Sequence, residues 1–161
     1  MAVELIPLSP ERFEEIVELA EEVFPYDKSH IPCPREGLRC SLEGRDYHED
    51  HERNGRYWYV LKDGKLAGFT GLYVHTQGPD DVAWLGWFGV APEVRGNGIG
   101  RKMLQATIDR AQYEGYQALR LYTTSLPGEE VAQRLYEEAG FTLVDRQESS
   151  RCTTFYMEKV F

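Results

Sequence analysis

Hydrophobic side chains recur along this chain with two different periods, and the change of period marks where helices give way to strands. Between residues 13 and 24 they recur every three or four positions behind Ser9 and Pro10, which predicts a helix that ends at Pro25. The same spacing predicts helices at 102–114 and 129–139. Alternating or continuous apolar runs predict strands at 3–8, 56–61, 65–76, 82–90, 118–124, 141–146 and 152–159.

Turn signals arrange these strands into a sheet. Asp63-Gly64 is typical of a tight hairpin, so the strands at 56–61, 65–76 and 82–90 should form an antiparallel meander. The helix at 102–114 joins the last of them to 118–124, and a helical crossover makes those two strands parallel. Residues 26–55 are the least regular part, with short helices expected at 36–42 and 46–53. We predict one α/β (α+β) domain with a mixed sheet, residues 1–161.

Composition narrows the class of protein. Eighteen basic and 27 acidic side chains give a net charge of -9, which argues against a nucleic-acid partner because binding to phosphate backbones needs a basic surface. The N-terminal residues lack a signal-peptide pattern, and no apolar run is long enough to span a bilayer. We therefore expect a cytoplasmic protein without a membrane partner. The three cysteines are odd in number and irregularly spaced, so we do not expect a disulfide framework.

A glycine-rich segment between a predicted strand and a predicted helix is the strongest candidate for chemistry. Gly96, Gly98 and Gly100 alternate there, directly before the helix at 102–114. Glycines let the backbone approach a ligand closely, and the free N–H groups and positive dipole of a helix start attract anions. This pattern predicts a phosphate site.

Two common phosphate-binding patterns do not fit this segment. A Walker loop needs G-x-x-x-x-G-K followed by Ser or Thr, which the chain lacks. A dinucleotide fingerprint needs G-x-G-x-x-G and an acidic residue about 20 positions later, after the next strand. Here the spacing is G-x-G-x-G, and no Asp or Glu stands between Gln117 and Pro127.

Two motifs resemble those of the GNAT (GCN5-related N-acetyltransferase) superfamily. The first reads R-x-x-G-x-G from Arg95 to Gly100, after V-x-P, and is similar to the family's acetyl-CoA signature, in which the last glycine is often alanine. The second reads A-x-x-L-Y-x-x-x-G-F from Ala132 to Phe141. The resemblance implies a mostly antiparallel sheet of about seven strands flanked by helices. It also implies a splay between the two central parallel strands.

The resemblance further implies where acetyl-CoA, the acyl donor, binds. Backbone groups of the strand before the loop would bond the pantetheine arm, and backbone N–H groups of the loop would hold the pyrophosphate. The expected cofactor-binding residues are Phe88, Gly89, Val90, Arg95, Gly96, Asn97, Gly98, Ile99, Gly100 and Arg101.

The expected reaction is direct transfer of the acetyl group to an amine. Tyr136 matches the family's general-acid tyrosine, which protonates the departing thiolate. The backbone N–H of Val90 is expected to polarise the thioester carbonyl. The family often has an Asn where Glu129 stands, so one cofactor contact is replaced; Thr123, Thr124 and Ser125 are candidate substitutes.

The general base stays open. Thr124 and Trp84 stand where family members carry a glutamate on one strand or the other, and neither can accept a proton at neutral pH. A chain of ordered waters is one alternative. The other candidates are Tyr73, His75, Asp81, His48, Glu49 and His51.

The acceptor and some alternatives also stay open. Acidic charge and aromatic strands favour a small-molecule amine, with a peptide amine as the next candidate; a homodimer is a further expectation from the family. Cys33, Cys40, His48 and His51 include zinc-ligand types, but their spacing matches no standard site, so we expect no metal. A non-catalytic acyl-CoA-binding module and a zinc-stabilised interaction domain are the alternative functions.

Overall fold

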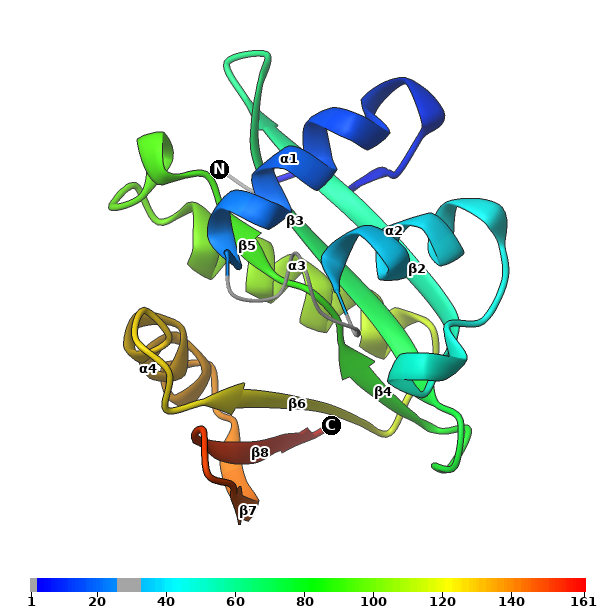
Figure 1. Ribbon diagram of the computed structural model, residues 1–161, viewed down its shortest axis with the longest axis vertical. Coiled ribbons are helices and arrows are strands. Elements are labelled where there is room, and N and C mark those ends of the chain that lie inside the picture. Colours follow the sequence, from blue (N-terminus) through cyan, green and yellow to red (C-terminus); the bar gives the residue numbers. More distant parts are fainter. Residues whose placement is uncertain (1–2, 26–32) are drawn as a thin grey trace.

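A computed structural model describes residues 3–25 and 33–161 of the chain. Its sheet has eight strands, in the order β1-β2-β3-β4-β6-β8-β7, with β5 pairing with β3 outside this path (Figure 1). Among the strands of the described residues, β4 and β6 pair in parallel and the other pairs are antiparallel. The predicted mixed, mostly antiparallel sheet is confirmed, with one strand more than expected.

The first half of the chain supplies β1–β5 and two helices. The helix start predicted at Pro10 is a 3-10 helix, η1, and α1 begins directly after it. The bounds are β1 (Ile6–Pro7), η1 (Pro10–Arg12), α1 (Phe13–Val23), α2 (Pro34–Glu43), η2 (His48–Asp50), β2 (Glu52–Lys62), β3 (Lys65–His75), β4 (Val82–Leu85) and β5 (Gly89–Val90). Part of the segment expected to be irregular, residues 26–32, lies outside the described residues.

The second half supplies the remaining strands and helices. The bounds are η3 (Pro92–Val94), α3 (Ile99–Tyr113), β6 (Ala118–Thr124), α4 (Glu130–Glu138), β7 (Thr142–Glu148) and β8 (Thr153–Val160). The two helices predicted in this half and the final antiparallel pair are confirmed, although α3 begins three residues before the expected residue 102. None of the helices in the described ranges combines the length and apolar character needed to cross a bilayer.

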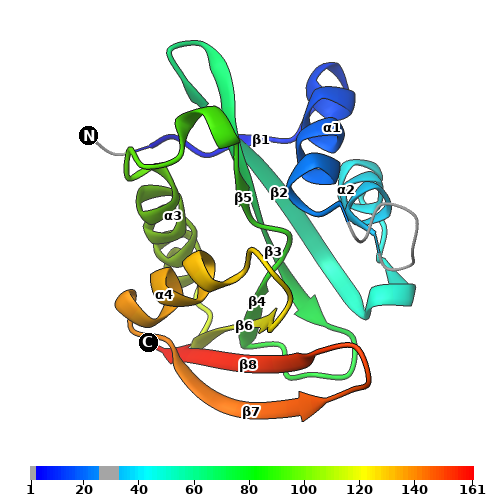
Figure 2. The ribbon, with the colours of Figure 1, turned by 60° about the vertical axis from the view of Figure 1, so that its left-hand side comes forward.

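Two helical layers cover the sheet. Figure 2 shows α1 and α2 on one side of it and α3 and α4 on the other. Leu38 of α2 and Ile16 of α1 are buried with Phe69 of β3, whereas Leu104 of α3 packs with Leu119 of β6. Because side chains of a strand alternate between its faces, each face of the sheet has its own core.

Two predicted elements are wrong. The helix expected at 46–53 is only the short η2, and Glu52 already belongs to β2, where it pairs with His75. The single strand expected at 82–90 is broken: β4 ends at Leu85 and β5 begins at Gly89. Both errors have the same cause. The order of apolar and polar residues along a segment does not show which other strand the segment pairs with, or where that pairing begins and ends.

The break is a β-bulge against β3. Phe69 pairs with Gly89 and Leu72 with Leu85, so two residues of β3 face three residues of the other strand. The Oη atom of Tyr57 accepts a hydrogen bond from the Trp87 N–H at 3.0 Å. The bulge leaves the Trp87 N–H without an acceptor on a neighbouring strand, and this buried tyrosine of β2 provides the acceptor instead.

Two glycines make room for Tyr57. A Cβ atom on Gly71 would lie 2.4 Å from Cε1 of the Tyr57 ring, and one on Gly86 would lie 2.4 Å from its Oη. The ring is 3% exposed, so it cannot swing into solvent. Glycine at these two positions is therefore a packing requirement of the bulge.

We predict that Gly71→Ala destabilises the protein by about 1–3 kcal/mol, because the added methyl group overpacks the core against a fixed ring. Gly55→Ala is the control, since its Cβ would come no closer than 3.7 Å to Glu52 Oε1. Urea midpoints measure both. Equal midpoints for the two variants would contradict this account of the bulge.

Candidate active site

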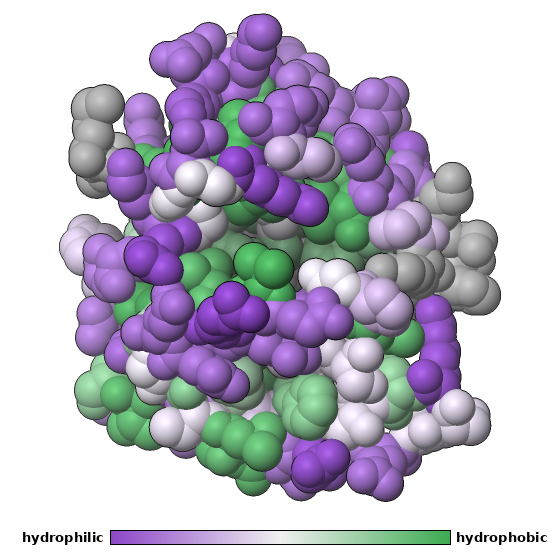
Figure 3. Space-filling model, turned by 90° about the vertical axis from the view of Figure 1, so that its left-hand side faces the viewer, coloured by the Kyte–Doolittle hydropathy of each residue, from purple (hydrophilic) through white to green (hydrophobic). Residues whose placement is uncertain are grey.

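The bulge opens a splay between the two central strands. β4 pairs with β6 only from Val82 to Trp84, and β5 pairs only with β3. The predicted splay is therefore present. Figure 3 faces this side of the molecule and shows hydrophobic side chains in a hollow between two hydrophilic parts.

The backbone of β5 presents a donor to the splay. Ala91 N–H donates to Ala67 O at 2.8 Å, and Gly89 pairs with Phe69 in the same register. Because N–H groups alternate between the two edges of a strand, the Val90 N–H points away from β3, toward the open side. Three residues before Val90, the Trp87 N–H already donates a hydrogen bond to Tyr57 Oη, so it is not available to a ligand.

The glycine loop ends the splay at the start of α3. Gly96 and Gly98 have φ values of 85° and 76°, in the left-handed region that glycine favours. Gly98 is the N-cap, and the first bond within the helix runs from Lys102 N–H to Gly98 O at 3.1 Å. The N–H groups of the three residues between them therefore have no acceptor inside the helix.

Side chains of the loop bond to the loop itself. Arg95 Nε donates to Val90 O at 3.2 Å, and Asn97 Nδ2 donates to Val94 O at 3.1 Å. Arg101 pairs with Glu138 of α4. A Cβ on Gly98 would meet no atom within 4 Å, so the space before the helix start is open. Open space in front of free N–H groups fits a phosphate group of a cofactor.

Tyr136 lies on α4, beside β5. Its ring is 6% exposed and contacts Phe88 and Phe141 edge-on, with centroids 6.2 and 6.1 Å away. Burial and, after it, the charge of Glu129 raise the pKa of Tyr136. The phenol is therefore protonated at neutral pH, which is the state required of a general acid.

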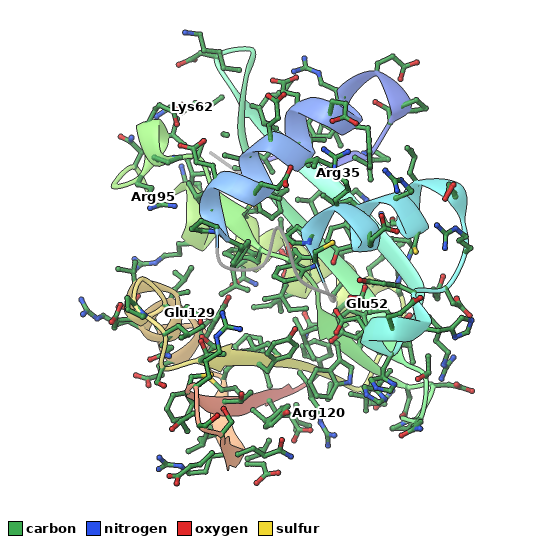
Figure 4. All side chains as sticks on the ribbon, in the orientation of Figure 1. Arg35, Glu52, Lys62, Arg95, Arg120 and Glu129 are labelled. Carbon is green, nitrogen blue, oxygen red and sulfur yellow. The ribbon has the colours of Figure 1, made fainter. Side chains whose placement is uncertain are left out.

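Glu129 is held at the start of α4 by β6. Its carboxylate accepts hydrogen bonds from Thr123 Oγ1, at 3.1 Å, and from Thr124 Oγ1. Ser125 Oγ accepts from Thr153 N–H at 2.9 Å. The three hydroxyls expected as substitutes for a cofactor contact are thus engaged within the protein, and two of them fix the carboxylate near Tyr136. Figure 4 shows Glu129 and Arg95 on the same side of the molecule.

The candidates for a base are divided by the fold. Tyr73 and His75 lie at the far end of the sheet, where Tyr73 stacks on Trp84 with ring centroids 6.3 Å apart and His75 stacks on His51, a third candidate, at 5.2 Å. Burial and the neighbouring His51 lower the pKa of His75. His48, Glu49 and Asp81 are exposed instead. A cavity of about 270 Å³ adjoins the aromatic group, lined by Trp84, Arg120, Val144, Asp145, Gln147 and Tyr156.

The candidates for zinc ligands do not assemble. Cys33 and Cys40 are buried on or beside α2, whereas His48 is exposed in η2. Within the described ranges, no three His, Cys, Asp or Glu side chains come together as a metal site would need.

Sequence reasoning missed Glu52. The expected helix at 46–53 would have placed it on a solvated surface, but at the start of β2 it is 3% exposed. Burial and a hydrogen bond with Asp50 raise the pKa of Glu52 well above its usual range. The register of β2 against β3 shifts between Arg53 and Arg56, so the residues around Glu52 do not show the regular alternation of buried and exposed positions that would have predicted its burial.

Comparisons with known proteins agree with this geometry. The model of the acetyltransferase (GNAT) family matches residues 13–141. The uncharacterized N-acetyltransferase YjgM of Escherichia coli is 30% identical over 89 residues, 55% of this chain and 52% of that protein. Mycothiol acetyltransferase of Sanguibacter keddieii is 34% identical over 91 residues, 55% of this chain and 28% of that protein. The chain thus matches about half or less of the length of these curated relatives.

Solved structures share the fold over nearly the whole chain. An aminoglycoside 6'-N-acetyltransferase complexed with coenzyme A has a TM-score of 0.78 at 14% identity, covering 99% of this chain and 97% of that one. The paia N-acetyltransferase of Thermoplasma acidophilum, in complex with coenzyme A, has a TM-score of 0.71 at 21% identity, covering both chains completely. The splay, the glycine loop and the matched family model lead to one conclusion: this chain belongs to the acetyltransferase (GNAT) family.

Proposed function

We propose that this chain is an acetyl-CoA-dependent N-acetyltransferase that moves an acetyl group directly to a small-molecule amine. One observation carries the proposal: the free N–H groups at the start of α3 lie at the end of a splay that runs past Tyr136. Family membership and the coenzyme A complexes of similar folds support the same donor.

Backbone groups would bind most of the donor. The N–H groups of 96–101 would hold the pyrophosphate, because partial positive charge gathers at a helix start. Residues 88–90 would bond the pantetheine arm as an added strand does, with Val90 N–H at the open edge. Arg95 and Asn97 would act mainly by fixing the loop, since both side chains bond to its carbonyls.

When bound, acetyl-CoA supplies a thioester whose carbonyl carbon a neutral amine can attack. Val90 N–H would stabilise the charge that develops on the carbonyl oxygen. Tyr136 Oη would donate a proton to the departing sulfur. Glu129 would keep that proton on the phenol until transfer, because a neighbouring carboxylate disfavours a second negative charge.

A second candidate function is a non-catalytic acyl-CoA-binding module. Thr124 and Trp84 occupy the strand positions at which family members carry a basic carboxylate, and Thr124 is bonded to Glu129. Such a module would bind acetyl-CoA but release no CoA with any amine. A screen of amine classes for CoA release separates the two functions.

Saturating acetyl-CoA should raise the melting temperature. At 100 times Kd, selective binding to the folded state contributes about 2.7 kcal/mol, which corresponds to roughly 5–10 °C for a chain of this size. Gly98→Ala should lose most of this shift, because its Cβ would project into the open space at the helix start.

Gly115→Ala is the matched control for that measurement, since Gly115 also has a positive φ, 91°, and open space around its Cβ position, but it lies just after the other end of α3. The absence of a shift in the wild-type protein would refute the proposal. Equal shifts in both variants would refute the assignment of Gly98.

Tyr136→Phe should lower kcat about 100-fold or more while the Kd of acetyl-CoA stays near the wild-type value. In the wild type, loss of activity through deprotonation of Tyr136 should begin only above pH 10, because burial raises its pKa. Tyr113→Phe, on the exposed side of α3, is the control. Unchanged kcat in Tyr136→Phe would exclude the phenol as the acid.

A further inference from the structure

The end of β6 borders the splay. On the β4 side, the pairing of β6 stops at Arg120, opposite Trp84, whereas β8 accompanies it on the other side as far as Thr124. In the described structure the stretch from Leu121 to Thr124 therefore turns an edge without a strand partner toward the splay. Figure 1 shows β6 running toward α4 and ending beside it. Side chains at this end of β6 can reach a molecule that binds in the opening.

The two threonines at the end of β6 face opposite sides of the sheet. Leu119 and Leu121 pack in the core with α3 and α4, and alternation places Thr123 on the same side, where it is buried. Thr124 points to the other side together with Arg120, which lines the cavity of about 270 Å³. On that side no helix of the described residues lies over β6 (Figure 1). Thr124 is only half-buried, so an acceptor can approach it from there.

Glu129 fixes the direction of the Thr124 hydroxyl. Thr124 Oγ1 donates its hydrogen to the Glu129 carboxylate and accepts a hydrogen bond from the Leu126 N–H at 3.2 Å. A hydroxyl oxygen has two lone pairs, so one remains after the bond from Leu126. Because the hydrogen is already used, the hydroxyl presents a lone pair to a ligand. A group in this state accepts a hydrogen bond from an amine.

The start of α4 holds the hydroxyl and the carboxylate in place. Gln133 donates its side-chain amide to Thr124 O at 2.7 Å and its backbone N–H to Glu129 O at 3.0 Å. Thr123 Oγ1 donates to the same carboxylate at 3.1 Å. The two groups therefore have a fixed geometry before a ligand binds, as catalytic groups require.

The candidate bases on and before β4, and on β3, lie at the closed end of the splay. Asp81 directly precedes β4, and β4 pairs with β6 from its first residue. Tyr73 pairs with Trp84, so His75 lies beside the first residues of β4. The splay opens only beyond the last residue of β4. The carboxylate at the end of β6 lies on this open side instead.

We propose that Thr124 and Glu129, the proton relay, deprotonate the ammonium group of the acceptor. This inference rests on the proposed function and deepens it, because that function requires a neutral amine whereas amines are largely protonated at neutral pH. An ammonium N–H would donate to Thr124 Oγ1. Its proton passes to this oxygen while the hydroxyl hydrogen passes to the Glu129 carboxylate.

The proton count of the reaction closes with this relay. A primary ammonium nitrogen carries three hydrogens and the amide product carries one, so two protons leave nitrogen. The first passes through Thr124 to Glu129, which is half-buried and releases it to water after the transfer. The second leaves as the C–N bond forms and the C–S bond breaks, and it replaces the proton that Tyr136 gives to sulfur. While Glu129 is protonated, its charge no longer opposes ionisation of the phenol.

The pH dependence of Glu129→Gln tests the relay. The probe is whichever of butylamine, spermidine, kanamycin and alanine amide releases CoA fastest with the wild type. Glu129→Gln should lower kcat about 100-fold near pH 7. The loss should shrink at least about 10-fold by about pH 9.5, because far more of the amine is then neutral without the relay. A loss caused by altered packing would be the same at both pH values.

Binding of acetyl-CoA gives a readout that is independent of turnover. Glutamine keeps one carbonyl oxygen for the threonine hydroxyls, so Glu129→Gln should retain the thermal shift that acetyl-CoA produces in the wild type. Glu130→Gln is the matched control. It changes the neighbouring, exposed carboxylate, which accepts the Gly128 N–H at 3.1 Å, and should keep wild-type turnover and thermal shift.

Two variants of Thr124 isolate the hydroxyl and keep the relay testable even if Glu129→Gln fails to fold. Valine has the shape of threonine without the hydroxyl, so Thr124→Val should show the same pH-dependent loss of kcat. Serine restores the hydroxyl, so Thr124→Ser should recover most of the activity that Thr124→Val loses.

Four results would overturn the proton relay. They are a kcat within about twofold of the wild type in Glu129→Gln or Thr124→Val, an equal loss at both pH values, no recovery in Thr124→Ser, and loss of the thermal shift in Glu129→Gln. If the wild type releases no CoA with any of the four amines, the proposed function fails and the relay with it. Release by the wild type together with one of the four results defeats the relay alone.

Discussion

The hydrogen bond from Trp87 N–H to Tyr57 Oη stabilises the β-bulge that opens the splay, and the candidate site depends on that splay. In this bulge two residues of β3 lie opposite three residues of the segment between β4 and β5, and the hydrogen bond gives the backbone N–H of that segment an acceptor. The bulge lets β5 continue along β3 after β4 has ended its pairing with β6, so the two central strands separate. Gly71 and Gly86 belong to the same arrangement, because any Cβ there would collide with the Tyr57 ring.

Around this opening the chain arranges three kinds of group. The start of α3 contributes backbone donors for negative charge, α4 contributes a buried phenol, and β6 fixes the carboxylate of Glu129 near that phenol. The far end of the same sheet carries Glu52 and Tyr73, two buried polar groups outside the family motifs.

Local signals located the elements whose causes are local. The Asp63-Gly64 turn, with both residues at positive φ, and the left-handed Gly98 before α3 follow from residue type alone. The broken strand at 86–88 and the brief η2 did not follow, because each depends on a partner far away in sequence. Tyr57 lies 30 positions from Trp87, and His75 faces Glu52 across the sheet.

The sequence by itself determined the family resemblance, the glycine loop and the place of Tyr136, since these are written in short spacings of particular residues. Tertiary structure alone decided that Thr123 and Thr124 bind Glu129 and that Glu52 is buried. The physical reason is that burial and hydrogen-bond pairing are properties of neighbours in space, and a one-dimensional pattern records only neighbours along the chain.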